Sequence, residues 1–315
     1  MKKKLHFIVT GGAGFIGSHL ASRLIDDGYN VTVIDNLSTG RERNIPKKAV
    51  FLNLDLAQEH TCTLLEPIQC DGVFHLSGQS SGEASFQDPL SDLRSHVLST
   101  FWLLKWCKEK NVRRFIYTSS MSIYGDPCYL PVDESHPAQP KSFYAAAKAS
   151  AEAYINLYRT MGIDATIFRL FSVYGPGQNL ENKMQGMVSI YLSYIIERMP
   201  IIVKGSKYRF RDIVYIDDVV DAFCKAIYNH KTYGKTYNVA SGVKTRVEDL
   251  IEALKAACDK PVYPVKYADG TPGDQFGIVG DIKAITQDLK WKPRTSLTAG
   301  LKKTVDFERE RMNFE

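Results

Sequence analysis

Residues 5–17 read Leu-His-Phe-Ile-Val-Thr-Gly-Gly-Ala-Gly-Phe-Ile-Gly, an apolar run that passes directly into a glycine-rich turn. The run from Leu5 to Thr10 predicts a buried strand. Apolar residues then recur at helical spacing from Ile16 to Ile25, where Asp26-Asp27-Gly28 predicts the end of a helix. The glycines therefore lie between a strand and a helix, and this context makes the motif informative.

The glycine positions fit a turn that holds a pyrophosphate. Gly11 permits the tight turn, Gly14 lets the backbone approach the ligand, and Gly17 allows close packing of the helix. The anion would lie at the helix N-terminus, where backbone N–H groups point outward. The residues predicted to contact it are Gly11, Gly14, Phe15, Ile16 and Gly17.

A second strand, Asn30 to Asp35, ends on an acidic residue 18 positions after Gly17. A carboxylate there can accept hydrogen bonds from both hydroxyls of an adenosine ribose, and it would repel a 2′-phosphate. Asp35 therefore favours NAD over NADP. The alternative interpretation is a glycine turn followed by an unrelated acidic residue.

The next β-rich runs alternate with helical stretches, which predicts an α/β fold with a doubly wound parallel sheet of the Rossmann type. After Phe171 the alternation gives way to loops and short strands, as expected for a smaller, interleaved α+β domain that binds substrate. We expect the dinucleotide domain to span residues 1–171, with returns at about 212–240. The substrate domain would comprise residues 172–211 and 241–315.

Tyr144 and Lys148 lie four positions apart in a predicted helix, so both face the same side. A nearby ammonium favours the phenolate and would lower the pKa of the tyrosine toward neutrality, which suits a general base. An exposed Tyr and Lys on a helix surface is the alternative. Thr118-Ser119-Ser120 ends an earlier predicted strand, and the carboxyl end of that strand could bring a hydroxyl beside the phenol.

Composition excludes several classes of protein. The 40 Lys+Arg and 35 Asp+Glu give a net charge of +5, but three of these charges are Lys2, Lys3 and Lys4. The remainder argues against a nucleic acid partner. No apolar run reaches the roughly 18 residues of a membrane span, and the N-terminus does not resemble a signal peptide. The six cysteines form no CxxC pair and no metal-ligand spacing, so we expect reduced thiols, no metal site and a cytoplasmic location.

Taken together, the motifs resemble the extended short-chain dehydrogenase/reductase family, in particular its NAD-dependent nucleotide-sugar epimerases and dehydratases, with UDP-glucose 4-epimerase-like enzymes as the nearest type. The resemblance covers essentially the whole chain. Its matching segments are TGGAGFIG (10–17), VIDNLSTG (33–40), Asp55-Leu56, HLSGQ (75–79), YTSSMSIYG (117–125), YAAAK (144–148), RLFSVYGPGQ (169–178), RFRDIVYIDDVVDA (209–222) and YNVASG (237–242).

The resemblance implies a role for individual residues. Tyr144 would be the general base, Lys148 would hold the nicotinamide ribose, and Ser120 would bond the reacting sugar oxygen. The residues implied to hold NAD also include Asp35, Asn36, Ser38, Thr39, Gly40, Asp55, Leu56, Leu76, Ser77, Gly78, Gln79 and Ser119. Those implied to hold a nucleotide-diphosphate sugar, most simply a UDP-sugar, also include Ser81, Ser172, Arg211 and Asp274.

Residues 120–122 favour one reaction within the family. Family dehydratases carry an Asp-Glu pair after this serine, and decarboxylases usually keep the Glu, whereas this chain has Met121 and Ser122. Epimerisation needs no such acid, because only the sugar hydroxyl exchanges a proton. We therefore expect a 4-epimerase that passes through a 4-keto sugar. The alternatives are a 4-keto reductase, an epimerase or dehydratase acting at another position, and a non-catalytic nucleotide-binding relative.

Several positions depart from the family. Ser172 and His96 each stand where the family commonly has Asn, and Thr271 stands where an Arg often clamps the diphosphate. His96 is either a cofactor contact or a partly exposed helix residue. Arg211 is the best remaining clamp, since a bidentate guanidinium suits a phosphate. The family also implies a homodimer, formed through the helices near 90–110 and 143–160.

Overall fold

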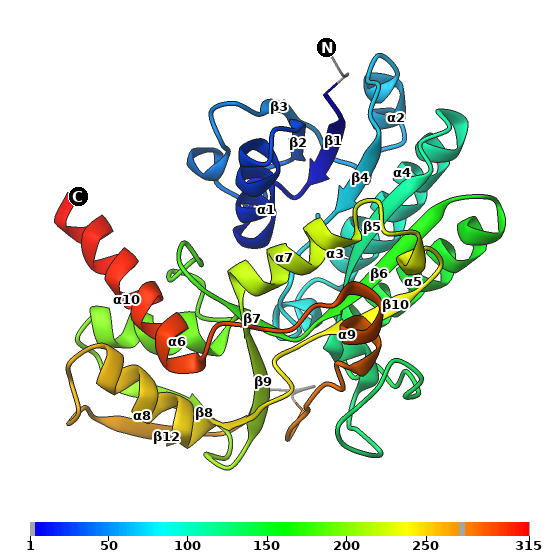
Figure 1. Ribbon diagram of the computed structural model, residues 1–315. Helices are drawn as coiled ribbons and strands as arrows, with labels where there is room; N and C mark the ends of the chain where they lie inside the picture. The colour runs from blue at the N-terminus through cyan, green and yellow to red at the C-terminus, as the bar shows by residue number, and fades with distance from the viewer. Residues whose placement is uncertain (1–3, 271–274, 315) are drawn as a thin grey trace.

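A parallel seven-stranded sheet forms the centre of the molecule (Figure 1). The computed structural model describes residues 4–270 and 275–314. The strand order is β10-β6-β5-β4-β1-β2-β3, and every neighbouring pair is parallel. The strands are β1 (His6–Thr10), β2 (Asn30–Asp35), β3 (Val50–Asn53), β4 (Gly72–His75), β5 (Arg114–Ser120), β6 (Asp164–Leu170) and β10 (Thr236–Val239).

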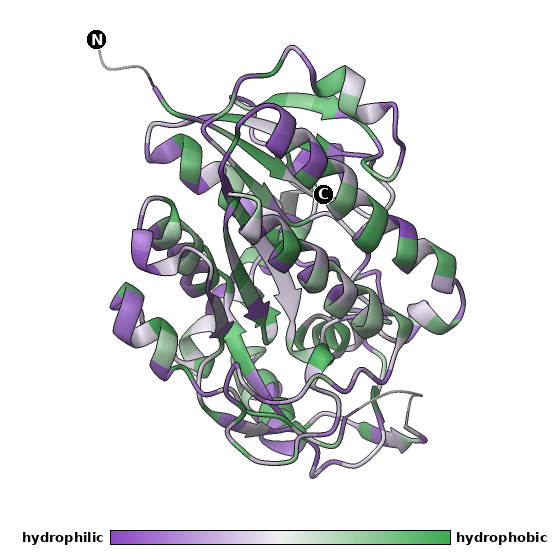
Figure 2. Cartoon of the chain, turned by 90° about the vertical axis from the view of Figure 1, so that its right-hand side faces the viewer, coloured by the Kyte–Doolittle hydropathy of each residue, from purple (hydrophilic) through white to green (hydrophobic). Residues whose placement is uncertain are grey.

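Helices cover both faces of this sheet because its strands are apolar on both sides. In β1, Phe7 and Val9 belong to one buried cluster and Ile8 belongs to the other, as the two-residue period of a strand requires. The first cluster packs under α1 (Phe15–Asp26) and α7 (Ile216–Ala226), and the second under α4 (Ser99–Glu109) and α5 (Phe143–Thr160). Figure 2 shows mostly hydrophobic strands between helices whose turns alternate in polarity.

Two shorter helical segments precede α4. They are α3 (Pro89–Asp92) and a π-helical segment, Leu93–Leu98, which runs directly into Ser99. On the same face of the sheet as α4, the short helix α2 (Thr61–Leu65) contacts α4. On the opposite face, α9 (Lys283–Leu289) contacts β10 and α7. The doubly wound α/β fold expected from the sequence is confirmed.

The smaller sheets lie beyond the carboxyl ends of the large sheet's strands, at the lower left of Figure 1. One contains β7 (Ser172–Tyr174), β9 (Phe210–Tyr215) and β11 (Lys244–Arg246), and the other pairs β8 (Ile201–Lys204) with β12 (Val265–Ala268). They pack with α6 (Met187–Ile196), α8 (Val247–Ala257) and α10 (Leu297–Phe314). Of the two later segments expected to return to the large sheet, β10 does so beside β6, whereas β9 pairs with β7 and β11.

Parallel pairing brings the carboxyl ends of the strands to one edge of the sheet, and this edge is where ligands bind in open α/β folds. Thr10, Asp35, His75 and Ser120 each end a strand there. Across residues 4–270 and 275–314, every helix is too short or too polar to cross a membrane.

Candidate active site

A cleft of about 780 Å³ runs along this edge, between the large sheet and the smaller ones. Its volume is that of a site for a large organic ligand. The cleft brings together 22 of the residues singled out in the sequence: Gly11, Gly14, Phe15, Ile16, Gly17, Asp35, Asn36, Ser38, Thr39, Asp55, Leu56, Leu76, Ser77, Gly78, Gln79, Ser81, Ser119, Ser120, Tyr144, Lys148, Ser172 and Arg211.

Gly40, also predicted to contact the cofactor, is not among the residues that line the cleft. Gly40 packs behind the cleft, where a Cβ would lie 2.8 Å from that of Ala13 and 3.1 Å from an Asp35 oxygen. Its role in this structure is to let the loop after β2 close onto the glycine turn. Asp274 lies outside the described residues, as does Thr271.

The glycine turn has no room for side chains. A Cβ on Gly17 would lie 2.2 Å from the backbone oxygen of Gly11. Gly11 itself has a φ of +68°, and a Cβ there would lie 2.8 Å from the backbone of Leu76 and Ser77. The N-terminus of α1 opens into the cleft at Gly14 without a capping side chain. The turn therefore forms a cradle of backbone groups suited to a pyrophosphate.

Asp35 is buried and already oriented by the backbone. One carboxylate oxygen accepts from the N–H of Ala13 at 3.0 Å and the other from the N–H of Leu37 at 2.8 Å. A carboxylate has about four lone-pair sites, so two bonds leave capacity for ribose hydroxyls. The donors fix the carboxylate beside the glycine turn, where an adenosine ribose would lie.

The loop after β4 is held against the same turn by Thr10. Its hydroxyl oxygen accepts from the N–H groups of Leu76 at 3.1 Å and Ser77 at 3.2 Å, and it contacts His75 Nδ1 at 2.8 Å. His75 Nε2 lies 2.9 Å from the hydroxyl of Thr100. Burial lowers the pKa of His75 to about 3, so the ring is neutral and acts as a structural support.

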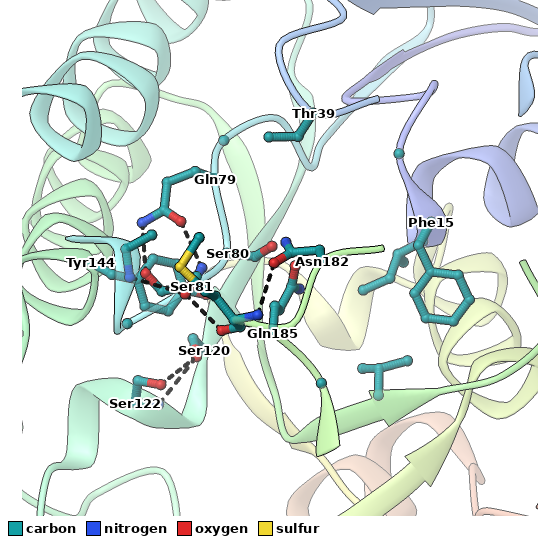
Figure 3. A pocket seen from close by; sticks show the side chains of 18 of the residues that line it. Phe15, Thr39, Gln79, Ser80, Ser81, Ser120, Ser122, Tyr144, Asn182 and Gln185 are labelled. Carbon is teal, nitrogen blue, oxygen red and sulfur yellow. Dashed lines mark hydrogen bonds between the residues drawn. The ribbon is translucent and has the colours of Figure 1, made fainter. Parts of the chain in front are cut away.

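Tyr144, Lys148 and Ser120 line the cleft together, and Figure 3 shows Tyr144 and Ser120 in it. Helix α5 begins after Ser142, whose hydroxyl accepts from the N–H of Ala145 at 3.2 Å and caps the helix. This cap fixes the first turn, which carries Tyr144, and Lys148 follows one turn later. The ammonium of Lys148 donates to the backbone oxygen of Thr118 at 2.7 Å.

The structure corrects the expected pKa of Tyr144. Burial raises it to about 12, and the hydrogen bond with Ser120 opposes this only in part. Burial also lowers the pKa of Lys148 to about 7, although Glu152 and Asp92 favour its cation. The expected lowering of the tyrosine pKa is therefore not found for the protein alone, because desolvation, with the charge of Asp92, outweighs the hydrogen bond with Ser120.

Glu152 lies one turn beyond Lys148 but is bound by another cation. The guanidinium of Arg169 donates to its two carboxylate oxygens at 3.0 and 2.7 Å. Arg169 also donates to the hydroxyl of Tyr124 at 3.1 Å, which in turn donates to Asn238 on β10 at 2.6 Å. This network satisfies the carboxylate, so Lys148 bonds backbone rather than forming an ion pair with Glu152.

The sugar end of the cleft is lined by small neutral residues. The hydroxyl of Ser120 donates to that of Ser122 at 3.2 Å and accepts from the Ser122 N–H at 3.2 Å. On the facing side, the hydroxyl of Ser81 donates to the backbone oxygen of Met184 at 2.8 Å, which links the loop after β4 to the loop before α6. Met121 also lines this end of the cleft.

Two cationic side chains, Arg211 and Lys204, line the end of the cleft next to the smaller sheets. Arg211 on β9 is buried, and its guanidinium donates to the backbone oxygens of Phe210 at 2.8 Å and Gln275 at 2.9 Å. Burial lowers its pKa to about 10, so it stays charged at neutral pH. Lys204 also reaches the cleft but pairs with Glu83 at 2.8 Å.

Asp92 is a site residue that the sequence did not reveal. It is 1% exposed, it lines the cleft, and its carboxylate accepts from the amide of Gln79 at 2.7 Å. Its spacing of four residues before His96 was the available signal, because residues four apart on a helix face the same way.

The cleft defines a dinucleotide-dependent enzyme of the short-chain dehydrogenase/reductase type, and comparison with known proteins identifies the family. The family model described as the NAD dependent epimerase/dehydratase family matches residues 7–240. The chain belongs to this family, and its cofactor is NAD, as Asp35 had indicated. The glycine cradle and the oriented carboxylate of Asp35 fit this cofactor.

Relatives share the whole length of the chain. The UDP-glucose 4-epimerase of Mycolicibacterium smegmatis is 34% identical over 311 residues, which cover 96% of this chain and 98% of that protein. The UDP-glucose 4-epimerase of Thermotoga maritima, solved with UDP-glucose, has a TM-score of 0.93 and 31% identity over 98% of this chain and 100% of that one. UDP-glucuronic acid decarboxylase 1 of Arabidopsis thaliana is 30% identical over 319 residues, which cover 99% of this chain and 71% of that protein.

Proposed function

We propose that this chain is a UDP-sugar 4-epimerase of the UDP-glucose/UDP-galactose type. The observation that carries the proposal is the composition of the sugar end of the cleft, where Ser120 is followed by Met121 and Ser122. Elimination of water needs an acid and a base beside the sugar, and these two side chains supply neither. Tyr144 with Ser120 is sufficient for a reaction that only moves a proton on and off one hydroxyl.

In the proposed reaction, Tyr144 takes the proton of the C4 hydroxyl as that carbon is oxidised to a ketone. NAD, when bound, accepts the C4 hydride and returns it. Ser120 holds the C4 oxygen, and Lys148 holds the nicotinamide ribose. After the 4-keto sugar rotates, the hydride would return to the opposite face of C4, and Tyr144 gives the proton back to the same C4 oxygen. No atom is gained or lost, so the cofactor is regenerated in every cycle.

Without bound ligands, Tyr144 is protonated near neutral pH and cannot act as a base. A positive charge close to its hydroxyl would make it one. The cationic nicotinamide ring and a protonated Lys148 would both favour the phenolate. A lysine whose pKa is about 7 can respond to the arriving ligands. The pKa of Tyr144 should therefore fall on binding of the oxidised cofactor, which couples the base to the state in which it is needed.

For the other parts of the molecule we propose the arrangement expected from the family. Arg211 would bind the diphosphate, and residues 1–171 with 212–240 would hold NAD, while residues 172–211 and 241–315 would hold the nucleotide sugar. A homodimer through α4 and α5 is supported by the exposed apolar residues on that side: Leu93, Leu98, Tyr154, Leu157 and Met161. The six free cysteines suit the cytoplasm.

The test is direct. Purified protein is denatured to release and identify its nucleotide, and a panel of UDP-hexoses is incubated with the native protein and followed by NMR. We expect stoichiometric NAD and formation of the C4 epimer without added cofactor. If no UDP-hexose is epimerised at C4, the proposal is wrong. Stoichiometric oxidation of added reduced cofactor in the presence of a 4-keto sugar would instead identify a reductase.

A further inference from the structure

His96 occupies a position that the reaction does not yet explain. It lies in the π-helical segment between α3 and α4, and its side chain is 1% exposed. Short π-helical stretches inside α-helices occur frequently at functional sites.

The imidazole contacts the catalytic helix and the cofactor loop at once. Its ring meets the ring of Tyr144 edge to face, with centroids 5.4 Å apart and planes at 69°. On another side it covers Gly78, where a Cβ would lie 2.2 Å from His96 Cε1. Gly78 lines the dinucleotide path and has a φ of +126°. The glycine is therefore required by backbone conformation and by the presence of this ring.

A buried carboxylate completes the contacts. His96 Nε2 lies 3.6 Å from the Oδ1 atom of Asp92, which also accepts from Gln79 in the cofactor loop. Among the described residues, neither ring nitrogen of His96 nor the Oδ2 atom of Asp92 makes a hydrogen bond of normal geometry. Such groups are costly in a protein interior. Catalytic hydrogen bonds are often long before ligands bind and shorten in the complex.

The charge state of the ring follows from its surroundings. Burial, and next to it the charge of Lys148, holds the pKa of His96 well below its usual range, and the backbone of Gln79 opposes this weakly. The imidazole is neutral at pH 7 and carries one N–H. Asp92 Oδ1 is the acceptor that Nε2–H faces, which leaves Nδ1 toward the loop of Gly78 and Gln79.

We propose that His96 is a positioning residue that fixes the Tyr144 ring relative to the cofactor loop 76–79. It does so by ring contact on one side and by its link to Asp92 and Gln79 on the other. Only the expected change in kcat depends on the proposed function, whereas the positioning of the Tyr144 ring does not. Two functions of the side chain are separable: filling the space beside Tyr144, and facing the Asp92 carboxylate with a polar nitrogen at 3.6 Å.

Three substitutions separate them. His96→Phe keeps a ring against Tyr144 and removes the polar link, His96→Asn keeps a polar group and removes the ring, and His96→Ala removes both. Since displacement of a catalytic group by about 1 Å can cost up to 100-fold in rate, we expect kcat to fall about tenfold in His96→Ala and less in the other two. KM for the UDP-sugar and the NAD content should stay within about twofold, because neither ligand loses a direct contact.

Leu104→Ala is the matched control. Leu104 is fully buried on the continuing helix α4 and belongs to the core under the sheet. Its truncation should lower Tm as much as His96→Ala does, without changing kcat. Equal kcat in wild type and His96→Ala would overturn the proposal, because the side chain would then not position Tyr144. Equal kcat in wild type and His96→Phe would overturn the part of the proposal that rests on the link to Asp92 and Gln79.

A second readout needs no turnover. The tyrosinate absorbance of Tyr144 is isolated in cofactor-free protein by subtracting the titration of Tyr144→Phe, in the wild-type and in the His96→Ala background. Removing the imidazole admits water beside the phenol, so we expect its titration to move to lower pH. An unchanged titration would contradict the proposed contact. A wild type that forms no 4-epimer would refute the proposed function alone and leave this result to decide the role of His96.

Discussion

The two ends of the cleft are built differently. At the dinucleotide end, the groups that face the ligand are backbone atoms of the Gly11–Gly17 turn and a carboxylate held by backbone N–H groups, all within one βαβ unit. At the nucleotide-sugar end, the lining comes from segments near residues 81, 122, 184 and 211, which are far apart in the chain. A substitution in the glycine turn changes the groups that face the ligand only by distorting the turn. At the nucleotide-sugar end, a single side chain can be replaced without changing the backbone.

This contrast explains where the family keeps its chemistry and where it varies. The proposed cofactor cradle depends on a conformation that favours glycine, such as the φ of +68° at Gly11. The choice of sugar depends on side chains such as Met121 and Ser122 and can diverge without disturbing the sheet. Tyr144, the proposed base, lies where the two ends meet. Four changes test this comparison.

Tyr144→Phe should have the largest effect, since it removes the proton acceptor at the junction of the two ends. We expect kcat to fall about 1000-fold, as is common for loss of a general base. NAD content and KM should be nearly unchanged, because the ring remains. The measurement is a progress curve of C4 epimer formation beside the NAD content of the same sample. Full turnover in this variant would remove Tyr144 from the mechanism.

Gly17→Ala tests the backbone end. The added Cβ would lie 2.2 Å from the Gly11 oxygen and would force the turn to shift. A steric cost of about 2–3 kcal/mol corresponds to roughly 100-fold weaker NAD binding. NAD released from the purified variant measures this.

Gly28→Ala is the control for the previous change. Gly28 follows the same helix, has a φ of +91°, and has open space around its Cα. Its substitution should lower stability by about 1 kcal/mol through backbone strain alone. Equal loss of NAD in both variants would show that the effect is general destabilisation rather than the geometry of the turn.

Arg211→Lys tests the side-chain end. A lysine keeps the charge but loses the planar fork, so we expect KM for the UDP-sugar to rise about tenfold while NAD stays bound. Arg246→Lys makes the same exchange at an exposed position on β11 and should change nothing. If NAD were lost together with substrate affinity in Arg211→Lys, the two ends would not be separable.

The last prediction concerns Lys148→Met and the pH dependence of the free energy of unfolding. The pKa of Lys148 falls from 10.5 to about 7 on folding, so between pH 7 and 10 the unfolded chain binds more protons than the folded one. The free energy of unfolding of the cofactor-free wild type should therefore rise with pH in this window, relative to the variant, by about 1–2 kcal/mol from pH 7 to 9. Urea unfolding of both proteins at the two pH values measures it. A difference that does not change with pH would mean that Lys148 is hydrated.

The dinucleotide end of the cleft was easier to predict from the sequence than the nucleotide-sugar end. A glycine turn between a strand and a helix, with Asp35 at the end of the next strand, is a local pattern, and local patterns are visible in sequence. The same holds for Tyr144 and Lys148, whose four-residue spacing determines that they share a helix face. The order of strands and helices predicted the doubly wound sheet on the same basis.

What the sequence could not reveal depends on contacts between distant segments or on burial. Asp92 becomes a site residue because Gln79, 13 positions earlier, donates to it. Glu152 would have been a natural partner for Lys148, yet Arg169 from β6 binds it instead. The raised pKa of Tyr144 follows from desolvation, which spacing does not report. Gly40 matched the motif but packs behind the cleft against Ala13.

The place of β10 has a consequence for how the chain is made. This strand pairs with β6, so that Thr236 lies opposite Ile167, after a long excursion through the smaller sheets. During synthesis, β6 would leave the ribosome as an unpaired edge and wait for some 65 residues before its partner emerged, and unpaired edges invite association with other chains. Asn238 on β10 also holds Tyr124, which bonds Arg169. The network around Lys148 is therefore complete only when about three quarters of the chain has been synthesised. A nascent chain that stops earlier would contain the glycine turn but not the complete surroundings of Lys148.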